Sequence, residues 1–379
     1  PLVEGSLRNT LGVTYMYLGE AELAIRQFER SRQLRSDNLS SDHPDVLTSM
    51  NNLALAYQDV GNLDQAMPLH KQTLEKRLAK LGPDHSDTLI SMNNLALAYQ
   101  DAGKLDQAVP LFEKTVEKTQ AKLGPDHPST LTITNNLAVA YQAVGKLDQA
   151  LPLYEKTLEK TQAKLGPDHP DTLRSMNSLA WGYQGAGRLR EAEPLFREAV
   201  TGARHKLGFA HPNTQTAVRN LVECYATLRQ PEKAEPIWRE LAAFWKEKAG
   251  ANSPQYAGQL ASLGLNLLQQ QKPADAEPPL RECLLIREKT DPDAWTTFNT
   301  KSLLGGSLLG QKKYAEAEPL LLAGCGGMQE REANIPAPSN IRLTEAIERL
   351  VQLYDAWDQK DKAEEWRKKL TVQAPGKND

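Results

Sequence analysis

Apolar, small and polar residues recur along this chain in a fixed order, with a period of 42 residues over most of its length. Each period holds a leucine followed by a small residue, then a tyrosine, a glycine, an alanine and a large side chain. Small residues allow two helices to approach closely, large ones fill the space between periods, and glycine suits a left-handed helix end. The pattern therefore predicts two antiparallel helices per period. In the second and third periods these positions are Leu53, Ala54, Tyr57, Gly61, Ala66 and His70, and Leu95, Ala96, Tyr99, Gly103, Ala108 and Phe112.

The alanine of each second helix counts the repeats, and it predicts nine helix pairs. Each unit is long enough for a second helix of roughly 17 residues, or ~25 Å. We expect one helical solenoid over residues 1–379, with regular repeats at 1–250 and divergent repeats at 251–370. A loop is expected near 334–340 and a flexible tail at 371–379. The alanines lie at Ala24, Ala66, Ala108, Ala150, Ala192, Ala234 and Ala276, spaced by 42 residues, and then at Ala317 and Ala363.

A second motif, Leu-Gly-Pro-Asp-His, recurs with the same spacing at residues 81–85, 123–127 and 165–169. Its Gly-Pro pair is expected to end the long helix, and in His127-Pro128 the histidine is a candidate cap for the next one. Metal binding is not expected, because equivalent points on packed helices lie ~8–10 Å apart while zinc needs ligands at ~2.0–2.3 Å. The Asp-His pairs lack a serine or cysteine in a nucleophile context, so no catalytic triad is predicted.

Composition excludes several classes of protein. The 45 basic and 48 acidic residues give a net charge of −3, which does not indicate a nucleic-acid partner. No apolar run of ~18 residues predicts a membrane span, and no secretory signal opens the chain. Cys224, Cys283 and Cys325 are far apart, which favours buried thiols in a reducing, cytoplasmic setting. We expect no cofactor and no catalytic activity, and we interpret the start at Pro1 as that of a fragment of something longer.

The sequence Asn51-Asn52-Leu53-Ala54, followed by Tyr57, Gly61 and the Leu-Gly-Pro-Asp-His motif, resembles the kinesin light chain family of tetratricopeptide repeats. The resemblance covers about residues 1–250. It implies an all-α, right-handed superhelix whose groove, lined by the first helix of each pair, binds a protein or peptide. The predicted partner is an extended peptide, and the chain is expected to be a monomer.

The resemblance also implies which residues face the groove. The first asparagine of each Asn-Asn pair is expected to bond the backbone of a bound peptide, because an amide both donates and accepts. An asparagine here can instead bond a neighbouring helix, which is the preferred interpretation for the second one (Asn52, Asn94, Asn136 and Asn220). The ligand face is expected over repeats two to six, with the later repeats as stack and cap. The candidates are Asn51, Asn93, Asn135, Asn177 and Arg219; Leu55, Leu97, Val139 and Trp181; and Gln58, Gln100, Gln142 and Gln184.

The last third is similar to the repeat tails of planctomycete-type bacterial serine/threonine kinases. This resemblance rests on residues 293–306, 311–314 and 317–322, while the glycines of Gly324-Cys325-Gly326-Gly327 depart from it and predict a loose helix. The kinase motifs themselves are absent from the sequence. The leading hypothesis is therefore a non-catalytic interaction scaffold. The alternatives are a substrate-recruiting tail of a larger bacterial enzyme such as a kinase, and a self-assembling repeat protein.

Overall fold

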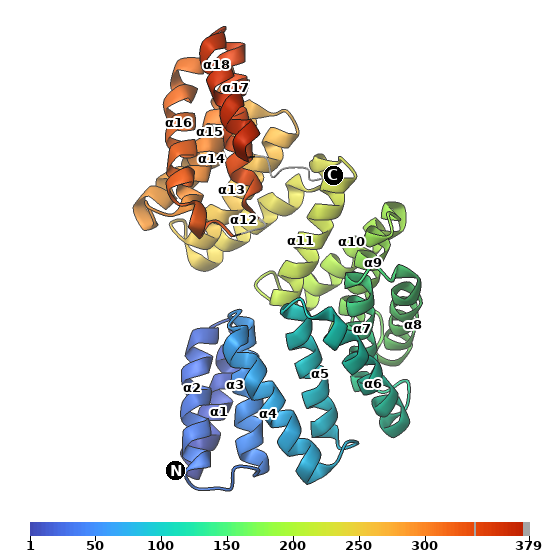
Figure 1. Ribbon diagram of the computed structural model, residues 1–379. Helices are drawn as coiled ribbons and strands as arrows, with labels where there is room; N and C mark the ends of the chain where they lie inside the picture. The colour runs from blue at the N-terminus through green and yellow to red at the C-terminus, as the bar shows by residue number, and fades with distance from the viewer. Residues whose placement is uncertain (337–338, 374–379) are drawn as a thin grey trace. The chain divides into compact units, whose positions relative to one another are not determined.

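The computed structural model describes residues 1–336 and 339–373, and within these ranges it contains helices, turns and loops but no strand (Figure 1). The chain divides into two compact units, residues 1–224 and 225–379. Residues 374–379 of the predicted tail and residues 337 and 338 of the predicted loop lie outside the described residues. The predicted all-α solenoid of nine helix pairs is confirmed for the described part of the chain.

The N-terminal unit consists of helices that alternate in direction along the chain, each packed on its sequence neighbours (Figure 1). Helix α11 begins in this unit and ends just beyond it. The helices are α1 (Leu2–Tyr17), α2 (Ala21–Ser36), α3 (Pro44–Asp59), α4 (Leu63–Leu81), α5 (Ser86–Asp101), α6 (Leu105–Leu123), α7 (Pro128–Ala143), α8 (Leu147–Leu165), α9 (Pro170–Gly185), α10 (Leu189–Leu207) and α11 (Pro212–Thr227).

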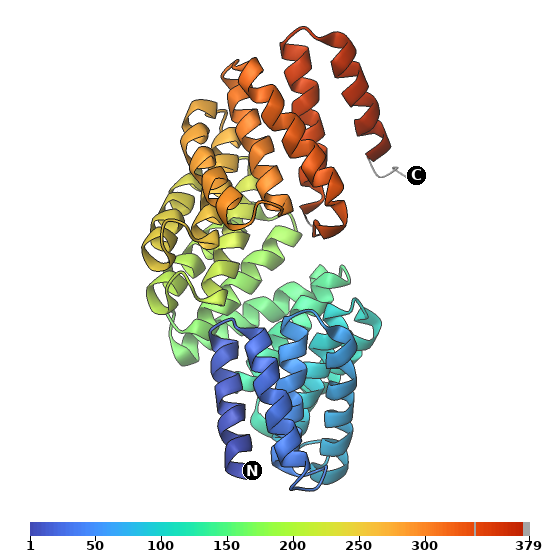
Figure 2. The same ribbon diagram turned by 90° about the vertical axis from the view of Figure 1, so that its left-hand side faces the viewer.

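The C-terminal unit continues the same alternation, which Figure 2 shows in yellow to red. A 3-10 turn, Pro231–Lys233, precedes its first long helix, and a second 3-10 turn, Glu332–Asn334, follows α16. The helices are α12 (Glu235–Ala249), α13 (Pro254–Gln269), α14 (Pro273–Thr290), α15 (Trp295–Gly310), α16 (Tyr314–Glu330), α17 (Ile341–Ala356) and α18 (Lys360–Gln373).

Buried small residues hold the two helices of each pair together. The repeat-marking alanines, such as Ala66, are completely buried, as is Ala54 on the facing helix. Gly61 has a φ of 74° and turns the chain between α3 and α4, a conformation that costs glycine little. Helix α4 has 19 residues rather than the roughly 17 expected, because it runs to Leu81, directly before Gly82.

The recurring histidines cap the first helices, as predicted for His127. The Nδ1 atom of His127 accepts a hydrogen bond from the backbone N–H of Ser129 at 3.2 Å. The loop before α5 is tied to the helix pair that follows it, because Lys118 of α6 forms an ion pair with Asp84 of this loop at 2.6 Å. The histidines and aspartates of the motif are therefore architectural. The same cap is formed by His43, His85, His169 and His211.

The glycine-rich stretch near residue 325 does not loosen its helix. Helix α16 is continuous across it, and Gly324 is buried against the backbone of α15. A Cβ atom at position 324 would lie 2.6 Å from the backbone nitrogen of Ser302 and 2.8 Å from the carbonyl oxygen of Phe298. The prediction of a loose helix was wrong, because the glycine allows α15 and α16 to approach more closely than any side chain permits.

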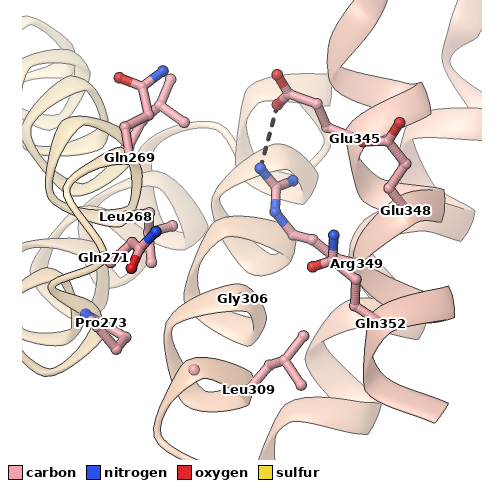
Figure 3. Close-up of a pocket in the computed structure, with 12 residues that line it drawn as sticks. Leu268, Gln269, Gln271, Pro273, Gly306, Leu309, Glu345, Glu348, Arg349 and Gln352 are labelled. Carbon is pink, nitrogen blue, oxygen red and sulfur yellow. Dashed lines mark hydrogen bonds and ion pairs between the residues drawn. The ribbon is translucent and has the colours of Figure 1, made fainter. Parts of the chain in front are cut away.

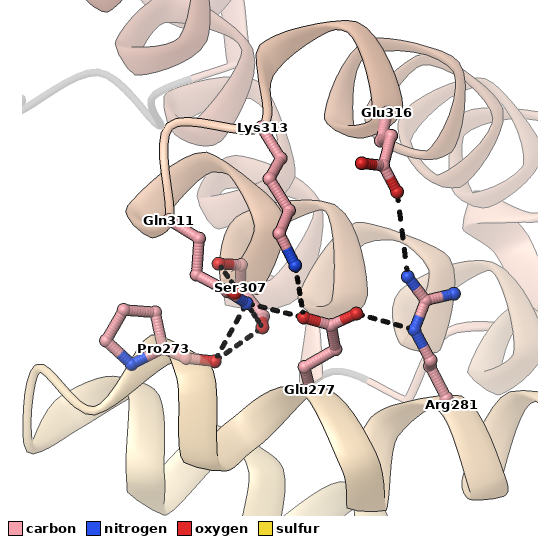
Figure 4. A network of polar contacts seen from close by, with 7 residues as sticks. All are labelled: Pro273, Glu277, Arg281, Ser307, Gln311, Lys313 and Glu316. Atoms are coloured by element: carbon pink, nitrogen blue, oxygen red, sulfur yellow. Dashed lines mark hydrogen bonds and ion pairs between the residues drawn. The ribbon is translucent and has the colours of Figure 1, made fainter.

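A buried carboxylate ties consecutive repeats of the C-terminal unit together (Figure 4). Glu277 of α14 accepts hydrogen bonds from Gln311 at 2.7 Å, Arg281 at 2.7 Å and Lys313 at 3.0 Å. The hydrogen bond from Gln311, with those from the two cations, lowers the pKa of Glu277 to about 2. Glu235 and Glu318 occupy the same position in neighbouring repeats and also pair with a lysine of the next repeat.

Replacing Glu277 with glutamine should lower the free energy of unfolding of this unit by about 1–2 kcal/mol, because charged hydrogen bonds are stronger than neutral ones. Since the folded pKa is depressed, the contribution of Glu277 is present above the unfolded pKa of about 4.5 and is lost as pH falls toward 2. Urea unfolding followed by tryptophan fluorescence measures it. The matched control is Glu316→Gln, an exposed carboxylate 3.8 Å from Arg281; equal losses in the two variants would contradict the prediction.

Candidate functional site

The predicted groove residues lie on one face of the first helices of the N-terminal unit, α3, α5, α7 and α9. In α3, Asn51, Leu55 and Gln58 are spaced by four and three residues, which places them on the same helix face. Leu97 and Val139 are half-buried against the cores of their own repeats. Trp181 is also half-buried, and Arg219 of α11 is exposed.

The asparagines form a ladder that links each repeat to the one before it. Asn94 donates from Nδ2 to the Oδ1 of Asn51 at 3.0 Å, and Asn136 donates to Asn93 at 3.0 Å. Asn220 donates to Asn177 at 3.2 Å in the same way. The second asparagine of each pair thus makes the inter-helix bond expected of it. The first asparagine is the acceptor and keeps part of its Nδ2 donor capacity, because its bond to the adjacent asparagine is long, at 3.4 Å for Asn51.

The ladder has one gap, at Asn135. The residue that would donate to its Oδ1 is Ser178, since the fifth repeat has serine where the others have a second asparagine. The Oδ1 of Asn135 is buried and has no hydrogen-bond partner among the described residues. A lone acceptor of this kind normally binds ordered water or a ligand donor.

The glutamines alternate between two arrangements. Gln142 accepts from the hydroxyl of Tyr154 at 3.1 Å and donates to the carbonyl oxygen of Trp181 at 3.2 Å. Gln58 is paired with His70 at 3.2 Å and with Asp101 at 2.5 Å. Gln100 and Gln184 instead have Phe112 and Phe196 of their own repeats in the place of the donor, and their Oε1 atoms are buried and have no hydrogen-bond partner among the described residues. Gln58 and Gln142 therefore also connect repeats.

A cavity lies in the C-terminal unit, on the equivalent helix face of α13, α15 and α17. It has a volume of about 600 Å³. Figure 3 shows Leu268 and Pro273 on one side, Glu345, Arg349 and Gln352 on the other, and Gly306 with Leu309 between them.

Arg349 lies on the polar side of this cavity and continues the asparagine ladder with a different pair of side chains. It occupies the position of the second asparagine of a repeat, and Ser302 occupies the position of the first asparagine in the repeat before. The Nη1 of Arg349 donates to the Oγ of Ser302 at 3.1 Å. Only 13% of its side chain is exposed, and burial lowers the pKa of its guanidinium. Glu345 accepts from Arg349 at 3.3 Å and from Arg342 at 2.9 Å.

Sequence reasoning did not single out this cavity, although two signals were present. Gly306 is a glycine at a position of the α15 face that carries a larger side chain in the regular repeats. Arg349 is a charged residue at a position that carries asparagine in repeats two, three, four and six. Both signals lay in repeats that were expected to serve only as stack and cap.

The folding pattern and the first-helix faces define a class of protein, the α-helical repeat proteins, whose extended surfaces bind other proteins. The family model described as tetratricopeptide repeat matches residues 3–79, 56–121, 87–163 and 129–205. Together these matches span more than half of the 379 residues, so the chain belongs to the tetratricopeptide repeat family.

Solved structures similar to this chain include a kinesin light chain-like protein of Podosopora anserina with nearly identical TPR-like repeats. It is 31% identical, with a TM-score of 0.45, over 53% of this chain and 94% of that one. BtubC (BKLC) from P. vanneervenii is 20% identical, with a TM-score of 0.45, over 58% of this chain and 86% of that one. The apo form of the quorum sensor NprR from B. thuringiensis is 13% identical, with a TM-score of 0.53, over 97% of each chain, and it supports the fold. No curated protein matches this chain.

The similarity of the last third to kinase tails has no counterpart in these comparisons and stays a prediction. Within the described ranges, the three cysteines are buried and form no disulfide. Histidine, cysteine and acidic side chains form no group there that could hold a metal ion. A search of the same residues found no helix with the length and apolar character needed to cross a bilayer.

Proposed function

We propose that this chain is a non-catalytic scaffold that binds an extended peptide, or an extended segment of a partner protein, along the first-helix face of α3, α5, α7 and α9. Tetratricopeptide repeats generally mediate protein–protein interaction, which is the coarse function that follows from the family. The observation that carries the finer proposal is the regular series of amides on one face, one per repeat. Asn51 and Asn93 retain part of their donor capacity, at a spacing set by the repeat.

The absence of catalysis is part of the proposal. The recurring aspartate and histidine of the loop motif have structural partners, as in Asp126, which pairs with Lys160, and His127, which caps α7. The chain is further proposed to act as a monomer in a reducing cytoplasm, where its buried thiols form no disulfide. Light scattering that shows a concentration-dependent dimer would contradict the monomer.

The test compares two sets of four alanine substitutions. The first set replaces Asn51, Asn93, Asn135 and Asn177; the second replaces Asn52, Asn94, Asn136 and Asn220. Both sets remove ladder bonds, but only the first removes the amides proposed to bind the ligand. Peptides enriched on the native chain from a random display library should bind the first variant at least about tenfold more weakly, since each lost hydrogen bond contributes about 0.5–1.5 kcal/mol.

Fluorescence anisotropy with the enriched peptides measures the affinity, and circular dichroism checks that both variants fold. Equal losses of affinity in the two sets would mean that the asparagines act only through stacking. No enrichment on the native chain would contradict peptide binding itself.

A second role, that of a substrate-recruiting tail of a larger bacterial enzyme such as a serine/threonine kinase, is favoured by the sequence of residues 293–322. The coding frame upstream of residue 1 tests it directly. A kinase domain in that frame supports the role, and an in-frame stop codon immediately upstream contradicts it.

A further inference from the structure

The cavity between α13, α15 and α17 lies where one side chain of the repeat pattern is missing. Counting from the repeat-marking alanines, Gly306 occupies the position of Leu55, Leu97, Val139 and Trp181 in the regular repeats. In those repeats the chain's own apolar side chain occupies this part of the helix face. Here the stem of Arg349 lies beside the glycine, 3.0 Å from the place of a Cβ atom, and the open volume next to it, about 600 Å³, greatly exceeds that of one side chain.

The side of the cavity near α13 carries apolar side chains beside two amides. Leu268 and Leu309 occupy the position of Gln184, so that leucine replaces the amide of the regular repeats. Pro273, Gln269 and Gln271 line the same side (Figure 3), and Leu265 completes it. The cavity therefore offers an apolar surface that can take a large aliphatic or aromatic side chain together with its neighbours in a peptide.

The side of the cavity near α17 carries two arginines and two glutamates, and one of the glutamates makes no ion pair. Glu345 is paired with both Arg342 and Arg349, and Arg349 is in addition bonded to Ser302. Glu348 is exposed at the rim and has no hydrogen-bond or ion-pair partner among the described residues, although its charge acts on the nearby Arg349. The carboxylate open to a ligand is therefore that of Glu348, and it complements a lysine or arginine.

We propose that this cavity is a docking site for a peptide segment with a large apolar side chain directly next to a basic one. The apolar side chain fills the space above Gly306 and contacts Leu265, Leu268 and Leu309, while the basic side chain pairs with Glu348. The inference rests on the proposed function as a peptide-binding scaffold, and it adds a specificity pocket in repeats seven to nine. A buried apolar anchor beside a polar rim is the arrangement that contributes most to affinity at protein interfaces.

The test uses fluorescein-labelled heptapeptides with a fixed Gly-Ser background. One peptide has Leu-Lys at its centre, and the comparison peptides have Gly-Lys, Leu-Glu and Gly-Gly. On the native chain the Leu-Lys peptide should bind at least about tenfold more tightly than the Gly-Lys peptide, the factor expected for burial of one leucine. Leu-Glu should bind more weakly than Leu-Lys at low ionic strength.

Two variants examine the two walls separately. Gly306→Leu restores the residue type of the regular repeats and should weaken Leu-Lys binding about tenfold or more by filling the cavity. Glu348→Lys changes only an exposed side chain, so it carries little risk to folding, and it should reverse the preference from Leu-Lys to Leu-Glu. Glu332→Lys, an exposed acidic residue in the 3-10 turn outside the cavity, makes the same change in net charge and should leave the preference unchanged.

Equal binding of all four peptides to the native chain would overturn the inference, as would an unchanged preference in Glu348→Lys. If library peptides bind the native chain and are lost only in the four-asparagine variant, the proposed function stands and the cavity is not a site. If the Leu-Lys peptide depends on Gly306 and Glu348 while the asparagine variants bind normally, the cavity is a site and the groove of the N-terminal unit is not.

Discussion

The variant Gly324→Ala is expected to lose about 2–3 kcal/mol of unfolding free energy, whereas Gly326→Ala, two residues further along α16, is expected to gain about 0.5–1 kcal/mol. At Gly324 a methyl group would meet the backbone of α15, with the nitrogen of Ser302 at 2.6 Å. Backbone atoms cannot move aside as a flexible side chain does, so the two helices must separate and lose packing along their length. A Cβ atom at Gly326 has no neighbour within 4 Å, which leaves only the gain in helix propensity.

Urea unfolding monitored by tryptophan fluorescence suits this comparison, because five of the six tryptophans lie in the C-terminal unit: Trp238, Trp245, Trp295, Trp357 and Trp366. The Gly326→Ala variant is the control for the effect of adding a methyl group to helix α16 where no close contact is made. Two variants that shift the urea midpoint in the same direction would show that close approach of α15 and α16 is not what requires glycine at position 324.

Acidification should weaken the N-terminal unit through one buried histidine. His70 of α4 is 1% exposed and lies 3.2 Å from the Oε1 of Gln58. Burial lowers the pKa of His70 to about 4 from an ordinary value of 6.5. Because the folded pKa is depressed, the neutral form of His70 is the one that the folded state favours. Its contribution to the free energy of unfolding is complete above pH 6.5 and declines as pH falls toward 4. The loss over the full pKa shift is about 3 kcal/mol.

The matched control is His70→Phe, since phenylalanine stands at the same position in the third and fifth repeats. Phe112 packs there beside Ala140, and Ala98 is the corresponding neighbour of His70, so the ring fits without a change elsewhere. Tyrosine is less suitable, because Tyr154 requires Gly182 beside it. The measurement is the urea midpoint by circular dichroism between pH 7.5 and 4.5. If His70→Phe keeps the pH dependence of the native chain, the titrating group is another one.

The candidate site shows where sequence reasoning ends. The spacing of Asn51, Leu55 and Gln58 was sufficient to place them on one helix face, because helical periodicity is a local property. Their partners were not predictable, since they come from other helices. Asn94 donates to Asn51 from the next repeat, while Gln100 lacks the bond that Gln58 makes with His70, because Phe112 of its own repeat stands in that place.

The glycines of the C-terminal unit illustrate the same limit. As residues of low helix propensity they predicted a loose helix, and the contacts reverse that interpretation at Gly324. At Gly306 the missing side chain contributes to a cavity, which becomes visible only when α13 and α17 are placed on either side of α15. Propensity describes a residue in isolation, while both effects depend on the distance to another helix.

Sequence alone was enough to determine the all-helical class, the nine helix pairs, the close helix packing at the repeat alanines and the histidine cap at His127. Each follows from residue type and spacing within about one repeat, where local backbone preferences and periodicity decide. Only the tertiary structure decided which amides are occupied by the neighbouring repeat, which acceptors, such as Asn135, have no partner among the described residues, and where the cavity beside Gly306 lies. These depend on side chains brought together by stacking, and a linear pattern does not record the resulting distances.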